Sequence, residues 1–312
     1  MDKPRYSIVV PLYNEEEVVE ESHKRLKAVL DGCGDSYEII FVNDGSRDAT
    51  LEKAKALAQS NARLRVLSFS RNFGHQPAIT AGIDCARGDA VIIIDADLQD
   101  PPEVMLDMMA KWKEGYQVVY GKRSKRKGET VFKKLTAKLF YRFLNALSDV
   151  PLPPDAGDFR LLDRKVVETL KSMPERNRYL RGLVGWAGYR QTAVEYVREE
   201  RFAGETKYPL RKMLALGANA VTSFSLKPLK LAIYLGSLIS FVSFVFLVYV
   251  IVQRIANPQI AAGWASLAAI SLFLNGIVLI ILGIMGQYIG RIYDETKSRP
   301  LYIVDEDVRG RE

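Results

Sequence analysis

The sequence predicts an α/β protein with a doubly wound parallel sheet, followed by a hairpin of two transmembrane helices. Over residues 1–121, short β-branched runs alternate with segments of helical period, which is typical of strands joined by helical crossovers. The runs are apolar almost without interruption, as expected of strands that are buried on both faces. Residues 231–252 and 255–290 contain no charged side chain. Each stretch reaches the roughly 20 apolar residues needed to cross a bilayer.

Five strands and four helices account for the first part of the chain. The strands are expected at 6–12, 37–43, 63–69, 90–96 and 116–121. The helices between them are expected at 15–30, 49–60, 76–86 and 102–115. Because helices separate the strands, the strands should be parallel, with their carboxyl ends at one edge of the sheet.

The regular alternation ends after residue 121. Residues 132–147 have one apolar face and predict an amphipathic helix, either at the membrane surface or packed on the domain. Residues 151–163 are expected to form a proline-rich loop, and 188–202 to contain a strand.

These signals divide the chain into a soluble domain, a juxtamembrane segment, a membrane segment and a tail. Their expected bounds are 1–205, 206–228, 229–290 (helices at about 229–253 and 264–289) and 291–312. The first residues have too short an apolar stretch for a signal peptide. Basic residues flank the two spans, while the loop between them carries only Arg254. The positive-inside rule therefore places both termini in the cytoplasm and the hairpin tip outside.

The composition narrows the classes of partner. The net charge of +7 is compatible with nucleic-acid binding, but no nucleic-acid motif is present. Basic residues beside a membrane segment are more simply explained by contacts to the anionic lipid headgroups of the bilayer. Cys33 and Cys85 lack a metal-type spacing and suit a reducing compartment. The sequence leaves a homo-oligomer open.

Polar clusters follow every expected strand. They read YNEEE, NDGSRD, SRNFGH, DADLQD and GKRSKR. In open α/β sheets, ligands bind beyond the carboxyl ends of the strands. The repeated placement favours a binding site over ordinary polar loops.

Asp95 and Asp97 come directly after a buried strand, where carboxylates are costly without a cation. Magnesium commonly takes one or two carboxylates, keeps waters and completes its shell with substrate phosphates. Asp95, Asp97 and Gln99 match that need. A strand cap followed by a proline turn is the alternative.

Three other polar residues also have two interpretations. Asp44 either accepts a hydrogen bond from a nucleotide base or caps the helix that begins near Asp48. Glu15 either contacts a ligand or is a helix N-terminal acid that the dipole favours. His75 has no metal partner in the sequence and is assigned a structural role, with a place lining the site as the alternative.

Five motifs occur together in order: SIVVPLYNEE, VNDGSRD, SRNFGHQPAITAGI, DADLQDPPE and DAGDFRLLDRKV. This set resembles bacterial polyisoprenyl-phosphate glycosyltransferases of the bactoprenol glucosyltransferase type, relatives of dolichol-phosphate mannose synthase in glycosyltransferase family 2. The resemblance continues through GYRQTAVEYVREERFAGETKYPL and the two spans. It implies an A-type glycosyltransferase domain over 1–205, with a Rossmann-like nucleotide-sugar-binding sheet, followed by juxtamembrane helices and a two-helix anchor.

The resemblance also implies a role for each matching residue. The residues that match donor-nucleotide positions are Pro11, Tyr13, Glu15, Asp44, Asp95, Ala96 and Arg123. The residues that match the Mg²⁺ or Mn²⁺ site are Asp95, Asp97 and Gln99. Asp158 matches the proposed catalytic aspartate. The acceptor phosphate would meet Arg160, Arg201 and Lys207.

The implied reaction is an inverting transfer of a hexose to polyisoprenyl (undecaprenyl) phosphate at the inner cell membrane, for cell-envelope glycosylation. UDP-glucose is the preferred donor, while UDP-N-acetylhexosamine and GDP-mannose stay open. A processive polysaccharide synthase is one alternative, but the Gln-x-x-Arg-Trp signature is absent and two spans are few for an export pore. A non-enzymatic nucleotide-sugar-binding scaffold is another, but the metal aspartates and Asp158 are retained.

The role of Asp158 depends on the acceptor. A phosphomonoester has a second pKa of about 6, so it is largely dianionic near neutrality and has little need of a base. Asp158 is therefore expected to position groups or stabilise charge, with general-base catalysis as the alternative.

Overall fold

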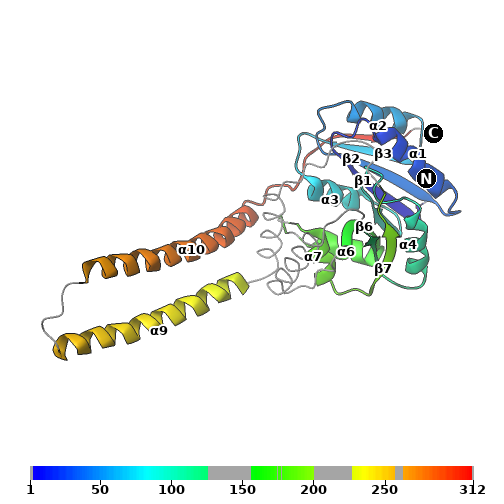
Figure 1. Cartoon of the computed structure of the whole chain (residues 1–312). Coiled ribbons are helices and arrows are strands. Elements are labelled where there is room, and N and C mark those ends of the chain that lie inside the picture. The colour runs from blue at the N-terminus through cyan, green and yellow to red at the C-terminus, as the bar shows by residue number, and fades with distance from the viewer. Residues whose placement is uncertain are drawn as a thin grey trace. The chain divides into compact units, whose positions relative to one another are not determined.

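The computed structural model describes residues 3–125, 156–173, 175–176, 178–199, 227–256 and 263–310. The chain forms two compact units, which are drawn in Figure 1. The first unit comprises Met1–Arg142, Val150–Lys212 and Arg299–Glu312, and the second comprises Phe143–Asp149 and Met213–Ser298. Several predictions fall outside the described residues, namely the amphipathic helix at 132–147, Arg201, Lys207 and the tip of the membrane hairpin.

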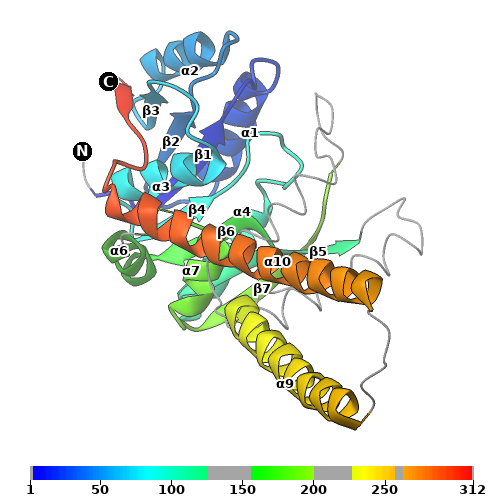
Figure 2. The ribbon, with the colours of Figure 1, turned by 90° about the vertical axis from the view of Figure 1, so that its left-hand side faces the viewer.

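A mixed sheet of eight strands forms the centre of the first unit (Figures 1 and 2). The strands are β1 (Tyr6–Leu12), β2 (Tyr37–Asn43), β3 (Leu64–Phe69), β4 (Ala90–Ile93), β5 (Val118–Lys125), β6 (Ala156–Asp163), β7 (Gln191–Val197) and β8 (Val304–Arg309). Their order across the sheet is β7-β5-β6-β4-β1-β2-β3-β8. The neighbours from β4 to β3 are parallel, as are β5 and β7. β6 and β8 run antiparallel to their neighbours.

The five predicted strands are confirmed, and so are the four helices between them. Every residue of β1 and β2 is buried, which explains their continuous apolar sequences. The helices of this unit are α1 (Val19–Asp31), α2 (Thr50–Gln59), α3 (His75–Cys85), α4 (Val104–Lys113), α6 (Arg164–Ser172) and α7 (Leu180–Trp186). Alternate β1 residues pack in one core with α1, α2 and α4. α3 packs so closely on β1 that a Cβ at Gly82 would lie 2.1 Å from Val9 Cγ1.

The prediction of a loop over 151–163 is wrong for residues 156–163, which form β6. β6 lies between β4 and β5, so the sheet is mixed and not purely parallel. Asp158 and Arg160 are 9% and 3% exposed. Buried charged residues interrupt the apolar run by which a central strand is recognised, and this hid the strand.

The expected tail at 291–312 contains a strand that the sequence did not predict. β8 pairs with β3 at the edge of the sheet. Its sequence VDEDVR has three acids, and most of its residues are exposed. Charged residues are common on edge strands because they discourage pairing with other chains, and they also remove the usual strand signal.

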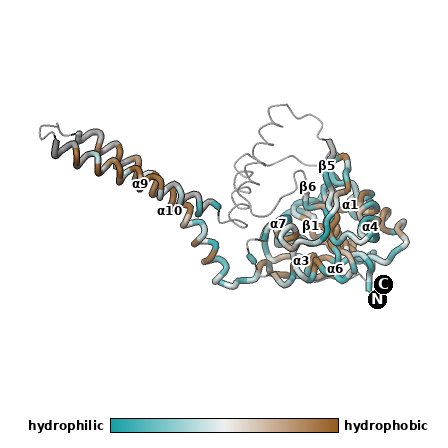
Figure 3. The backbone as a smooth tube through the Cα atoms, turned by 90° about the horizontal axis from the view of Figure 1, so that it is seen from below, coloured by the Kyte–Doolittle hydropathy of each residue, from teal (hydrophilic) through white to brown (hydrophobic). Residues whose placement is uncertain are grey.

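The second unit contains the helices α9 (Lys227–Ala256) and α10 (Trp264–Thr296), which contact each other. Both are apolar over most of their length, and Figure 3 shows brown residues along much of the two helices, with a hydrophilic end on α10. Within the described residues, one segment is long and apolar enough to cross a membrane, Phe273–Thr296 in α10. The apolar segment Ala232–Phe246 in α9 is shorter than that requirement. Of the two predicted spans, one is therefore supported.

Candidate active site

The carboxyl edge of the parallel strands gathers the acids that the sequence singled out. Asp44 follows β2, and Asp95 and Asp97 follow β4. Asp158 reaches this edge from the opposite direction. Because β6 is antiparallel to β4 and Arg160 is in register with Ile93, the residues before Arg160 extend past the end of β4.

The turn that carries Asp95 and Asp97 is backbone-strained. Leu98 has a φ of 56°, in the left-handed region that branched residues rarely adopt. Asp97 is 8% exposed, and its Oδ1 accepts the Gln99 N–H at 3.1 Å. Asp95 Oδ1 is buried and has no hydrogen-bond partner within the described part of the chain. Burial raises the pKa of Asp95 to about 6, opposed by His75 and reinforced by nearby carboxylates.

A divalent cation fits these residues as a partial ligand set. Carboxylate and amide oxygens are the ligands that Mg²⁺ prefers, and a donor's phosphates can complete the shell. In the described residues, no group of three or more His, Cys, Asp or Glu is arranged to hold a metal alone. The unsatisfied Asp95 Oδ1 nevertheless favours a cation here, because a buried carboxylate oxygen without a partner is costly.

The structure corrects the assignment of His75 to a structural role. His75 is the first residue of α3, and its Nε2 lies 3.3 Å from Asp158 Oδ2 and 3.7 Å from Asp95 Oδ1. Burial alone would lower the pKa of His75, but Asp158 and Asp95 outweigh it and raise the pKa to about 9. The imidazolium thus lies between Asp95, a candidate metal ligand, and Asp158, the candidate catalytic acid. In the sequence, the position of His75 in the polar cluster SRNFGH after the third strand was the signal for a place in the site.

Asp158 is held as an anion by side chains that the sequence did not single out. Arg181 Nε donates to Asp158 Oδ1 at 2.8 Å, and its Nη2 donates to Oδ2 at 3.3 Å. Gln76 Nε2 lies 3.4 Å from Oδ2. Burial alone would raise the pKa of Asp158, but His75 and Arg181 hold it well below its usual range. A carboxylate held in this way is a weak base.

Arg160, assigned to the acceptor phosphate, is almost fully buried beside Asp158. Its Nη2 donates to the Gly157 carbonyl at 2.8 Å. Its Nε is buried and has no hydrogen-bond partner among the residues that the structure describes. Burial lowers the pKa of Arg160 to about 10, although the charge of Asp158 opposes this. Arg160 therefore has an unused donor close to the acid cluster.

Asp100 organises a second cluster that sequence reasoning missed. It is 1% exposed and accepts a hydrogen bond from the Tyr196 hydroxyl. Arg123 Nη2 and Arg198 Nε lie 3.7 and 3.6 Å from Asp100 Oδ1. The cluster links the turn that carries Asp95 and Asp97 to β5 and β7, and it places Arg123, a predicted donor residue, beside that turn. Its partners come from distant parts of the chain, which no local motif could indicate.

The predicted donor loop after β1 contains buried and exposed residues. Pro11 is buried in β1, beyond the residues that pair with β4, so its missing N–H costs no hydrogen bond to that strand. Tyr13 is 44% exposed. The Glu15 N–H donates to Thr50 Oγ1 at 2.8 Å, which connects the loop to α2. Ala96 is buried between the two metal-site aspartates.

Asp44 does not cap the helix after β2, so that alternative is wrong. Asp48, just before α2, accepts the Thr50 N–H at 3.1 Å. Asp44 Oδ1 and Oδ2 instead accept the Phe73 and Gly74 N–H groups at 2.6 and 2.9 Å. Burial raises the pKa of Asp44, against these two hydrogen bonds. Asp44 therefore anchors the loop that leads into His75.

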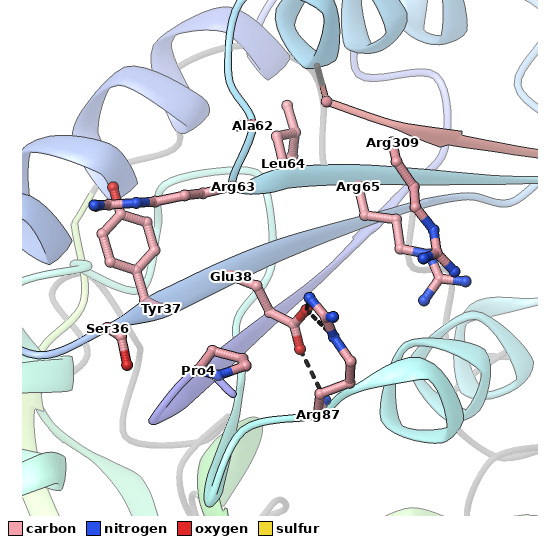
Figure 4. Close-up of a pocket in the computed structure, with 11 residues that line it drawn as sticks. Pro4, Ser36, Tyr37, Glu38, Ala62, Arg63, Leu64, Arg65, Arg87 and Arg309 are labelled. Carbon is pink, nitrogen blue, oxygen red and sulfur yellow. Dashed lines mark hydrogen bonds and ion pairs between the residues drawn. The ribbon is translucent and has the colours of Figure 1, made fainter. Parts of the chain in front are cut away.

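A pocket of about 390 Å³ opens at the opposite, amino edge of the sheet, shown in Figure 4. Four arginines line it: Arg63, Arg65, Arg87 and Arg309. Arg87 binds the buried Glu38 through its Nε and Nη2, and Arg65 binds Asp307 through two hydrogen bonds. Arg63 also lies 3.4 Å from Asp31, so most of the positive charge in this pocket is already matched by the chain's own acids.

The mixed sheet, with acids gathered at the carboxyl edge of its parallel strands, defines a protein of the A-type glycosyltransferase class. A family model described as glycosyl transferase family 2 matches residues 7–171. The chain belongs to glycosyl transferase family 2, and the resemblance noted from its motifs is confirmed.

Relatives match nearly the whole chain. A Bacillus subtilis glycosyltransferase, YkcC, is 56% identical over 302 residues, which cover 97% of this chain and 94% of that protein. The prophage bactoprenol glucosyl transferase homolog of Escherichia coli is 43% identical over 300 residues, covering 96% and 98%. The bactoprenol glucosyl transferase of Shigella phage SfV is 42% identical over 303 residues, covering 97% and 99%.

A solved structure supports the fold. Glucosyl-3-phosphoglycerate synthase from Mycobacterium tuberculosis, in complex with Mn²⁺, UDP-glucose and phosphoglyceric acid, matches with a TM-score of 0.50 and 23% identity. The match covers 70% of this chain and 78% of that one.

Proposed function

We propose that this protein transfers a hexose from a nucleotide sugar, with UDP-glucose as the donor, to polyisoprenyl phosphate in the membrane. The observation that carries the proposal is the pairing of Asp95, with its buried unsatisfied oxygen, and an Asp158 fixed as an anion. The acceptor class is supported by relatives named bactoprenol glucosyl transferase that match almost the full length of the chain.

Asp95, Asp97 and Gln99 would hold the divalent cation, Mg²⁺ or Mn²⁺. When bound, such an ion acts as a Lewis acid on the diphosphate oxygen, where negative charge builds as the glycosidic bond breaks. The chain provides the cation site with two carboxylates, those of Asp95 and Asp97, after the end of the buried strand β4. Arg123, held beside Asp100, adds a positive charge at the same turn.

The transfer is proposed to be a single displacement with inversion. An acceptor phosphate oxygen attacks the anomeric carbon, and the bond to the nucleoside diphosphate breaks. Asp158 is assigned a positioning and electrostatic role, because its pKa is held low by His75 and Arg181 against the effect of burial. A dianionic phosphate has no proton that a base would need to remove.

The remaining assignments follow the same arrangement. Pro11, Tyr13, Glu15, Asp44 and Ala96 are proposed to surround the donor nucleotide. Arg160, whose Nε has no hydrogen-bond partner among the described residues, is proposed to meet the acceptor phosphate together with Arg201 and Lys207.

The chain is further proposed to span the inner membrane twice, through α9 and α10, with the catalytic domain (1–205) and the tail in the cytoplasm. These helices have 30 and 33 residues, more than the roughly 20 that one crossing requires, and residues 231–252 of α9 carry no charge. Labelling of single cysteines from outside intact cells tests this topology. Pro258→Cys should react and Asp305→Cys should not, and the reverse pattern would overturn the orientation.

The reaction is tested with the full-length protein in nanodiscs, undecaprenyl phosphate, Mg²⁺ and labelled nucleotide sugars supplied singly. UDP-glucose should give a lipid-phosphate glucoside with a β-linkage from the α-linked donor. If the protein prefers another nucleotide sugar, that sugar replaces UDP-glucose as the proposed donor. Binding without any transfer would favour a scaffold, and a growing glycan would favour a processive synthase.

A further inference from the structure

The segment after α10 folds back onto the catalytic sheet. β8 pairs with β3, and the Ser70 N–H donates to the Ile303 carbonyl at 3.1 Å, just before β8 begins. At the other end of the pairing, Arg65 holds Asp307 through two hydrogen bonds of 2.7 and 2.8 Å. These contacts are made within the first unit.

Tyr302 makes two contacts across this junction. Its ring stacks on Phe69, the last residue of β3, with centroids 5.1 Å apart and planes 12° from parallel. Its hydroxyl donates to Asp84 Oδ2 on α3 at 2.8 Å. Tyr302 therefore joins the end of β3 to α3, and the loop formed by residues 70–74 connects these same two elements.

The loop 70–74 also contacts the predicted donor site. Phe69 packs edge-to-face on Phe73, with centroids 5.7 Å apart. The Phe73 N–H donates to Asp44 Oδ1 at 2.6 Å, and His75 follows directly. A continuous set of contacts thus runs from Tyr302 through Phe69 and Phe73 to Asp44.

The loop has little freedom where it passes Gly45. A Cβ at Gly45, which has a φ of 62°, would lie 2.4 Å from the Arg71 carbonyl carbon. The loop backbone therefore packs directly on the turn that carries Asp44. A small shift of this loop would move both Asp44 and His75, because Asp44 accepts hydrogen bonds from the loop and His75 follows it directly in the chain.

We propose that Tyr302 is a positioning residue for donor binding, which fixes loop 70–74 and, through it, Asp44 and His75. The proposal rests on the proposed function in one respect, the assignment of Asp44 to the donor nucleotide. Its physical basis is a population effect. If the stack on Phe69 is lost, the loop occupies its binding-competent arrangement for a smaller fraction of the time, and the apparent donor affinity falls by that fraction.

The experiment compares Tyr302→Ala, Tyr302→Phe and Asp307→Ala in the full-length protein in nanodiscs. Tyr302→Phe keeps the stacked ring and removes only the hydrogen bond to Asp84. Asp307→Ala is the matched control, because it loosens β8 at the end away from the loop. Kinetic constants for both substrates, UDP affinity, thermal stability and hydrogen exchange of the Phe73 and Gly74 amides are measured.

Tyr302→Ala should raise the KM for the donor and weaken UDP binding about three- to tenfold, the range expected from loss of an aromatic pair. Its kcat and its KM for lipid phosphate should stay near wild type, and the Phe73 and Gly74 amides should exchange faster. Tyr302→Phe should restore most of the donor affinity. Asp307→Ala should lower thermal stability without changing the donor KM.

If Tyr302 is purely structural, Tyr302→Ala should lower kcat per mole of protein and leave both KM values unchanged, or Asp307→Ala should raise the donor KM as much as Tyr302→Ala does. Either result overturns the proposal. Asp44→Asn separates this from a failure of the proposed function. If Asp44→Asn weakens UDP binding and Tyr302→Ala does not, the positioning role alone is wrong. If neither variant changes UDP binding, the donor-site assignment is wrong as well.

Discussion

The two edges of the central sheet both carry buried carboxylates, but only one edge satisfies them fully. At the amino edge, Glu38 Oε1 accepts from Ser7 Oγ and the Arg87 N–H at 2.6 and 2.8 Å. Its Oε2 accepts from Arg87 Nε and Nη2 at 3.1 and 2.9 Å. At the carboxyl edge, Asp95 Oδ1 is buried without a hydrogen bond among the described residues.

The difference distinguishes an acid that stabilises the fold, Glu38, from one that we propose binds a ligand, Asp95. A fully hydrogen-bonded carboxylate such as Glu38 costs little to bury, whereas an incomplete one lowers stability. The carboxyl edge also contains two acids whose environments push their pKa values in opposite directions, up for Asp95 and down for Asp158. Such separation is common in active sites, where neighbouring carboxylates have different tasks.

The largest expected effect on turnover is at the carboxyl edge, at Asp95 and its neighbour Asp97. Asp95→Asn and Asp97→Asn should each reduce turnover on the order of 10³-fold, because a principal electrostatic contribution to the transition state is lost. Thermal stability of Asp95→Asn should be unchanged or higher, because the raised pKa of Asp95 means that the folded protein disfavours its charged form, even with His75 3.7 Å away. Turnover measurements and thermal melts test both statements, with the exposed Asp107→Asn as the matched control.

Chelation should abolish wild-type activity, and added Mg²⁺ or Mn²⁺ should restore it. Full activity in excess chelator would remove the cation from the mechanism. A marked fall in the stability of Asp95→Asn would make Asp95 a structural acid like Glu38.

A smaller loss is expected at Asp158. Asp158→Asn should slow the reaction on the order of 10²-fold through lost positioning and charge, and any residual product should stay β-linked. Because a positioning role does not depend on removing an acceptor proton, the deficit should persist from neutral to alkaline pH. Rates and product linkage are measured across that range. Recovery at high pH would identify a general base, and an α-linked product would overturn the single displacement.

The amino edge should respond in the opposite way. Glu38→Gln should lower the free energy of unfolding by about 1–2 kcal/mol, since Arg87 loses a charged partner while the hydrogen bonds are kept in part. The kcat and KM values of the folded protein should not change. Chemical denaturation measures the effect, with the exposed Glu114→Gln as the control. A loss of turnover without a loss of stability would give the pocket beside Glu38 a functional role.

The same contrast explains what the sequence predicted well. The strands from β1 to β4 are buried on both faces, so their apolar runs were recognisable and their bounds were close. β6 was missed because Asp158 and Arg160, which serve the candidate site, stand in the middle of its pattern. β8 was missed because its acids protect an exposed edge. In both strands, charged residues that serve another purpose replace the apolar residues by which a strand is recognised in a sequence.

Only those residues of the candidate site that belong to local sequence motifs were predicted. The strand-end acids were identified because each follows an apolar run directly. Arg181 and Asp100 were not, because their partners are brought to them by the fold: Asp158 for Arg181, and Tyr196 for Asp100. His75 was noticed but misassigned, since its neighbours Asp95 and Asp158 lie in other strands or strand ends.

The smallest expected effect concerns the pH dependence of stability at the carboxyl edge. The pKa of His75 is raised in the folded protein to about 9, from an ordinary value of 6.5. The folded state therefore holds this proton more tightly than the unfolded state. The stabilising contribution of His75 is fully present below pH 6.5 and is lost as the pH rises through 9. Asp95, with a pKa of about 6, is almost fully ionised above about pH 7, and Asp158 titrates lower still, so above that pH the charges of these two acids are constant.

Thermal melts between about pH 7 and pH 9, in excess chelator, should therefore show a decline in the wild type that is reduced in His75→Asn. The other histidine provides a control of opposite sign. Burial lowers the pKa of His23, so its contribution is lost toward acid pH and not in this window. His23→Asn should keep the wild-type decline on the alkaline side. Identical slopes for His75→Asn and the wild type would mean that His75 is neutral in the folded protein. In that case the carboxyl edge would lack the one cation that approaches Asp95 within 4 Å in the described structure.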